Sequence, residues 1–107
     1  MIGIFVTMLL AGTGADLRHD FAECLKQADT RAQTQKIAAE GFVDFVRTTC
    51  STAAAPFEAA LTTANIKNGM TKKAAAADAA SQINDYYSER LENYKIELQP
   101  LPPEKPK

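Results

Sequence analysis

Residues 17–32 read LRHDFAECLKQADTRA, and the apolar residues in this stretch recur at intervals of three and four. That spacing is typical of one face of an α-helix. The face comprises Leu17, Phe21, Cys24, Leu25, Ala28 and Ala32. The charged residues, expected largely on the opposite side, are Arg18, Asp20, Glu23, Lys26 and Asp29. The stretch therefore predicts an amphipathic helix, with Asp16 as its N-cap.

A second helical run follows, with the apolar residues Phe42, Phe45, Val46, Cys50 and Ala53. Residues 33–41 between the runs are mostly polar, and Gly41 is able to break or cap a helix. If the helices form an antiparallel hairpin with Cys24 opposite Cys50, the facing residues are apolar. The other pairs are Phe21 with Ala53, Ala28 with Val46, and Ala32 with Phe42. This register predicts a turn near Ile37, whereas a single break at Gly41 would leave the cysteines at different heights.

Cys24 and Cys50 are the only cysteines in the chain, and their interpretation depends on the compartment. In an exported protein they predict one intramolecular disulfide, because exported compartments are oxidising. In the cytosol they would be two buried thiols. They lie too far apart for the Cys-x-x-Cys spacing of a redox-active pair. We therefore expect a structural bridge.

Two more helices are expected before residue 99. The third is short, with Pro56 in its first turn and an ending at Asn68-Gly69. Its apolar face comprises Phe57, Leu61 and Ala64. Thr71 is expected to cap a long fourth helix, Lys72 to Leu98. The apolar stripe of that helix comprises Ala76, Ala79, Ile83, Tyr86, Tyr87, Leu91, Tyr94 and Leu98. The predicted fold is all-α, a small antiparallel bundle of about four helices.

Residues 1–15, MIGIFVTMLLAGTGA, have the pattern of a secretory signal peptide. An apolar run from Ile2 to Ala11 precedes the small residues Thr13-Gly14-Ala15, although no basic residue starts the segment. Thr13 stands where a lipoprotein would need cysteine, and the run is too short to span a bilayer. The alternative is an N-terminal helix or strand of the domain itself. We expect a signal peptide over 1–15, a helical domain over 16–98 and a tail over 99–107.

The tail reads QPLPPEKPK, and its prolines favour an extended, disordered segment. Pro100, Pro103 and Pro106 have the PxxP spacing of polyproline ligands. Such a tail is either a spacer or a recognition motif.

Composition and motifs exclude several classes of function. With 12 Lys and Arg against 13 Asp and Glu, the net charge is −1, which disfavours nucleic-acid binding. His19 is the only histidine, expected at the surface, so a catalytic triad is hard to build. No run of residues has metal-ligand or phosphate-loop spacing. We therefore predict no catalytic, metal or cofactor-binding residues and no enzyme, unless carboxylates from several helices gather in a cavity.

The densest group of side chains suited to binding comprises Tyr86, Tyr87, Arg90 and Tyr94. Tyr and Arg are enriched in binding hot spots, so one interpretation is a strip that binds a partner. The other is a set of tyrosines at the border of the core, with rings inside and hydroxyls at the rim.

These features predict a small exported protein, periplasmic or extracellular, without enzymatic activity. It would bind another protein or an envelope component, with no nucleic-acid partner and no stable membrane insertion of the mature chain. One version is a holdase chaperone that opens in acid or heat, since the architecture resembles small, disulfide-bridged helical proteins of the bacterial periplasm. The alternative is a carrier of a small hydrophobic ligand inside the bundle.

Overall fold

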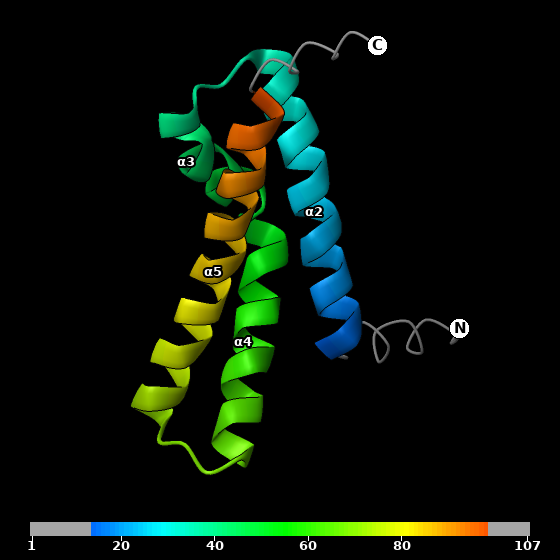
Figure 1. The fold of residues 1–107 in the computed structure, drawn as a ribbon. Helices are drawn as coiled ribbons and strands as arrows, with labels where there is room; N and C mark the ends of the chain where they lie inside the picture. The colour runs from blue at the N-terminus through cyan, green and yellow to red at the C-terminus, as the bar shows by residue number, and fades with distance from the viewer. Residues whose placement is uncertain (1–13, 99–107) are drawn as a thin grey trace, which may run out of the picture.

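The structure is a computed structural model that describes residues 14–98, and this range holds four helices and no strand (Figure 1). The helices are α2 (Gly14–Gln35), α3 (Ala39–Thr49), α4 (Ser51–Lys67) and α5 (Lys72–Leu98). The all-α prediction is confirmed. The predicted tail and residues 1–13 of the predicted signal peptide lie outside the described residues. Gly14 and Ala15 open α2, so Asp16 lies in the first turn rather than at the N-cap, where its charge still suits the helix dipole.

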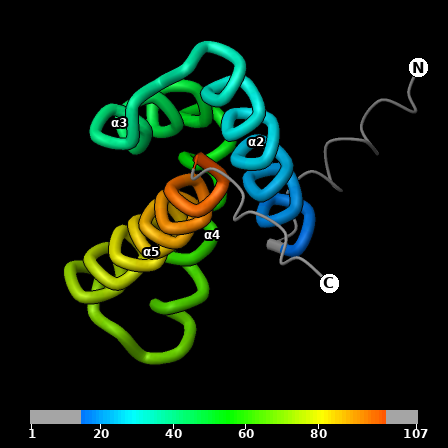
Figure 2. Tube along the Cα trace, turned by 45° about the horizontal axis from the view of Figure 1, so that its top comes forward, coloured from blue at the N-terminus to red at the C-terminus, as the bar shows by residue number. Residues whose placement is uncertain are grey.

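The helices α4 and α5 form an antiparallel pair, and α2 lies beside the upper half of that pair (Figure 1). Because α2 and α5 run in the same direction, the C-terminal end of α5 meets the C-terminal half of α2. The short helix α3 folds back near this end, and the last turns of α5 lie between α2 and α3 (Figure 2). The end of α5 therefore lies beside both α2 and α3.

The connection from α2 to α3 confirms the predicted turn near Ile37. The Ile37 N–H donates to the Ala32 carbonyl at 2.9 Å, and the Lys36 N–H donates to the Gln33 carbonyl at 3.1 Å. This is the Schellman arrangement of a helix C-terminus. Lys36 occupies its left-handed position with a φ of 58°. Gly41 is not the break, because it lies within α3.

The junction at Cys50 corrects two predicted boundaries. The Cys50 N–H donates to Val46 in α3, while the Cys50 carbonyl accepts from Ala53 and Ala54 in α4. One residue thus ends α3 and begins α4, so the second helix does not continue to Ala53. Pro56 lies in the second turn of α4 instead of its first. Its missing N–H leaves the Thr52 carbonyl without a helical donor, which water can replace because Thr52 is exposed.

Local signals place the α4–α5 connection and the start of α5 as predicted. Gly69 has a φ of +103°, and the Met70 N–H donates to the Asn65 carbonyl at 3.1 Å. Only glycine adopts such a φ without strain, so Gly69 allows the chain to turn away after α4 has ended at Lys67. The Thr71 hydroxyl then accepts a hydrogen bond from the Ala74 N–H at 3.2 Å, which caps α5.

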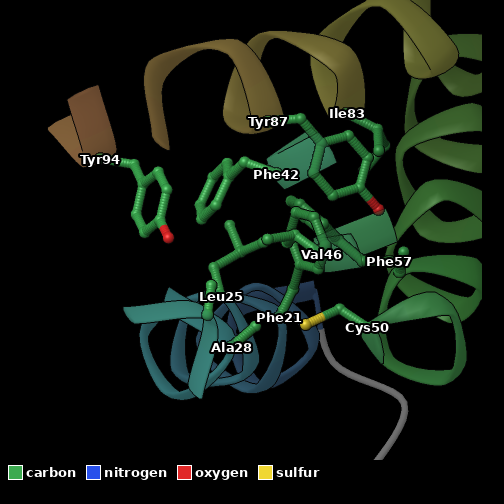
Figure 3. Close-up of a cluster of buried hydrophobic side chains, with 12 residues drawn as sticks. Phe21, Leu25, Ala28, Phe42, Val46, Cys50, Phe57, Ile83, Tyr87 and Tyr94 are labelled. Atoms are coloured by element: carbon green, nitrogen blue, oxygen red, sulfur yellow. The ribbon is translucent and has the colours of Figure 1, made fainter. Parts of the chain in front are cut away.

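The core between the helices is rich in aromatic rings. Phe21 is fully buried and packs against Phe57, Tyr86 and Tyr87, with ring centroids 5.4–5.8 Å apart. Beside it, a disulfide between Cys24 and Cys50 holds α2 to the α3–α4 junction, as predicted. Figure 3 shows buried side chains that reach the core from all four helices, among them Phe21 of α2, Phe42 of α3, Phe57 of α4 and Tyr87 of α5.

Four residues depart from the predicted faces. Asp29, expected on the solvent side, is buried. Ala64, Ala76 and Leu98, expected in the core, are exposed. In α5 the buried position is Ala75 rather than Ala76, in line with Ala79 and Ile83 at intervals of four. Leu98 is the last described residue, and it is 46% exposed.

Candidate functional site

The structure separates the four residues of the predicted strip into two pairs. Tyr87 and Tyr94 are buried, whereas Tyr86 and Arg90 are partly exposed. Of these four residues, Tyr86 and Arg90 are therefore the two placed where a partner could contact them.

Tyr86 occupies the centre of the accessible region. Its ring packs edge-on against Phe21 at 5.4 Å and Phe57 at 5.8 Å, which holds the side chain in place. Two adjoining surface depressions share Tyr86 and Glu89. One, of about 280 Å³, is lined by Gln82, Asp85, Tyr86 and Glu89. The other, of about 230 Å³, is lined by Ala22, Leu25, Tyr86, Glu89, Arg90 and Asn93. Together they form the Tyr86 groove.

The Tyr86 groove combines the Tyr86 ring, Ala22 and Leu25 with polar or charged side chains, namely Gln82, Asp85, Glu89, Arg90 and Asn93. Gln82 donates to Asp78, and Arg90 is paired with Asp29, so both already have partners. Asp85 and Glu89 are exposed one helical turn apart, and no other residue within 14–98 forms an ion pair or hydrogen bond with either carboxylate. In the described part of the chain, two carboxylates without a charge partner therefore border a fixed aromatic ring.

Next to the groove lies a set of polar side chains that we name the Asp29 cluster: Asp29, Gln33, Arg90 and Glu97. The Arg90 Nε donates to Asp29 Oδ2 at 3.0 Å. The Gln33 amide donates to Asp29 Oδ1 at 2.8 Å and to Glu97 Oε1 at 2.9 Å. Partial burial, a hydrogen bond to Asp29 and the charge of Asp29 raise the pKa of Glu97, while Arg90 opposes the shift. The cluster joins α2 to the end of α5.

The two buried tyrosines serve packing and local hydrogen bonding. Tyr94 stacks on Phe42 at 4.1 Å between ring centroids, and its hydroxyl donates to the Ile37 carbonyl at 2.7 Å. Burial raises the pKa of Tyr94, and the charges of Asp29 and Glu97 raise it further. The Arg47 guanidinium lies 4.7 Å from the centre of the Tyr87 ring. Burial raises the pKa of Tyr87, although Arg47 lowers it. These hydroxyls stay protonated at neutral pH.

Sequence reasoning missed Asp29, Gln33 and Glu97. A signal for Asp29 existed, because it follows Phe21 and Leu25 at intervals of four on the apolar face. Gln33 continues that interval at the edge of the face. No comparable signal marked Glu97, whose contacts lie in a distant helix.

The described residues offer few groups for other chemistry. Between residues 14 and 98, no group of three or more His, Cys, Asp or Glu side chains is arranged to hold a metal ion. His19 is exposed on α2. None of the helices in this range has the length and apolar character needed to cross a membrane.

The chain matches no protein-family model, no curated protein and no solved structure. Similarity to known proteins therefore indicates no activity for this chain.

Proposed function

We propose that this is an exported, non-enzymatic protein that binds another protein through the Tyr86 groove. The observation that carries the proposal is the fixed, partly exposed Tyr86 ring bordered by the carboxylates of Asp85 and Glu89, which have no ion-pair or hydrogen-bond partner within residues 14–98. Tyrosines held in this way are frequent anchors of protein interfaces. The complementary partner presents an apolar side chain for the ring and a lysine or arginine for the carboxylates.

The proposed partner chemistry predicts a charge-dependent interaction. A lysine- and leucine-rich amphipathic peptide should shift the backbone NMR signals of Tyr86, Glu89 and Asn93, while the same peptide with glutamate in place of lysine should not. Asp85→Lys with Glu89→Lys should weaken binding by about tenfold or more, because attraction becomes repulsion. Higher salt should weaken binding to the unmodified protein as well.

A matched control for this experiment lies on α3. Glu40 and Asp44 are exposed and have the same spacing as Asp85 and Glu89, so Glu40→Lys with Asp44→Lys changes the net charge equally. The control variant should keep its affinity for the peptide. Equal loss in both variants, or NMR shifts outside the Tyr86 groove, would contradict the proposed site.

Export is the second part of the proposal, and the Cys24–Cys50 disulfide supports it because such bridges form in oxidising compartments. Leu17 packs against the core while Ala15 and Asp16 are exposed, so cleavage after Ala15 would remove no described core residue. Protein purified from its own host should therefore begin at Asp16. Intact-mass measurement should also show a gain of about 2 Da on reduction. A mass that includes Met1 would argue against cleavage.

A chaperone-like version of this function would use the same groove for many unfolded clients, and suppression of client aggregation under acid or heat is its test. The ligand-carrier alternative has no comparable support, since both depressions that form the Tyr86 groove open at the surface.

A further inference from the structure

The last two turns of α5 are attached to the rest of the molecule through one face. Arg90, Tyr94 and Glu97 follow one another at intervals of four and three, so their side chains share that face. Arg90 and Glu97 reach Asp29 and Gln33 on α2, while the Tyr94 hydroxyl reaches the connection before α3. The attachment of this end thus depends on polar contacts as well as on the Tyr94–Phe42 stack.

The net charge of the Asp29 cluster depends on whether Glu97 is protonated. When Glu97 is ionised, the Asp29 cluster contains two carboxylates and one guanidinium, and the excess charge is negative. When Glu97 is protonated, Asp29 and Arg90 balance each other, and the Glu97 carboxyl is able to donate to Asp29. The groups facing Glu97 are Asp29 and Gln33 from α2 and Arg90 and Tyr94 from α5. From α3, Phe42 stacks on Tyr94, and the acidic residues of that helix, Glu40 and Asp44, are exposed.

We propose that Asp29, Gln33 and Glu97 form a proton-dependent latch, which fastens the end of α5 to α2 in mild acid and loosens it at neutral pH. The proposal concerns a conformational device and does not depend on the proposed function. The latch would close in acid, whereas the chaperone-like function would require the protein to open in acid. The latch closes because acid removes a repulsion between two carboxylates. The Tyr94–Phe42 stack and the Tyr94–Ile37 hydrogen bond are the contacts that would open when the latch loosens.

The direction of the pH effect follows from linkage. The pKa of Glu97 is raised in the folded protein, so folding favours its protonated form. The stabilising contribution of such a group is fully present below the unfolded pKa of glutamate and is lost as the pH rises through the folded value. Because Glu97 is exposed, the effect should be local to the end of α5 rather than global.

The decisive experiment compares amide protection factors at Tyr94 and Lys95 between about pH 4 and about pH 7, corrected for intrinsic exchange. In the unmodified protein, protection should increase severalfold toward mild acid. Glu97→Gln carries a neutral amide in place of the protonated carboxyl, so its protection should stay high across this range. Glu92→Gln, an exposed carboxylate on the same helix, should behave like the unmodified protein. Equal pH dependence in the unmodified protein and Glu97→Gln, or none in the former, would overturn the latch.

A second variant tests the carboxyl pair directly. Asp29→Asn removes the charge and the strong acceptor that face Glu97, so the NMR titration midpoint of the Glu97 carboxyl should fall toward the ordinary glutamate value. This readout reports the local interaction even if the variant is less stable overall. An unchanged midpoint would show that Asp29 does not control the proton on Glu97.

Discussion

Replacing Phe21 with alanine should lower the free energy of unfolding by about 3–5 kcal/mol, which is a large share of the stability of a domain of this size. Phe21 is fully buried, and its ring contacts one aromatic ring from α4 and two from α5. The substitution would remove these contacts and leave a cavity where three helices meet. Urea denaturation followed by far-UV circular dichroism measures the loss.

Two further variants serve as comparisons for the loss of stability in Phe21→Ala. Phe21→Leu keeps most of the apolar volume and should cost about 1–2 kcal/mol. Phe45→Ala removes the same atoms from a partly exposed position on α3 and should cost clearly less than Phe21→Ala. A loss below about 1 kcal/mol for Phe21→Ala would mean that the aromatic cluster is not the centre of the core.

Replacing both Cys24 and Cys50 with alanine should lower the free energy of unfolding by about 3.5 kcal/mol. The bridge closes a loop with a sequence separation of 26, and opening it restores conformational freedom to the unfolded chain. For a domain of this size the melting temperature should fall by about 15–25 °C. Calorimetry of the variant and of the reduced unmodified protein measures the effect.

The double variant and the reduced protein should agree closely, because alanine fits the space around the buried Cys50 and the half-buried Cys24. A variant as stable as the oxidised protein would show that helix packing alone fixes the α3–α4 junction. A reduced protein much less stable than the variant would instead point to the burial of thiols as an added cost.

Local signals allowed much of the fold to be predicted. Thr71 fixes the start of α5 and Asn68-Gly69 fixes the end of α4 through hydrogen bonds within a few residues, so residue type was sufficient. The turn before α3 was located by hairpin register, since Lys36 in a left-handed conformation gives no signal of its own. The junction at Cys50 was missed because the apolar spacing continues through it to Ala53.

The candidate site was harder to predict, because its contacts join distant parts of the chain. Tyr86 and Tyr87 are adjacent, and a helical wheel alone does not decide which of them faces the core. Asp29 was placed on the solvent side by its charge, although its position lies on the apolar face. Its burial depends on Arg90, which lies 61 residues later, and no local pattern predicts such a pair.

The α4–α5 pair extends well beyond the N-terminal end of α2 (Figure 1). Of the described helices, α4 and α5 alone pack together in that distal part, and Asn68, Gly69 and Thr71 at the turn are exposed. This end should open independently of the rest of the molecule, in a separate cooperative unit of lower stability. The loop between α4 and α5 is therefore the natural position for inserting a reporter domain, far from the disulfide and from the end of α5.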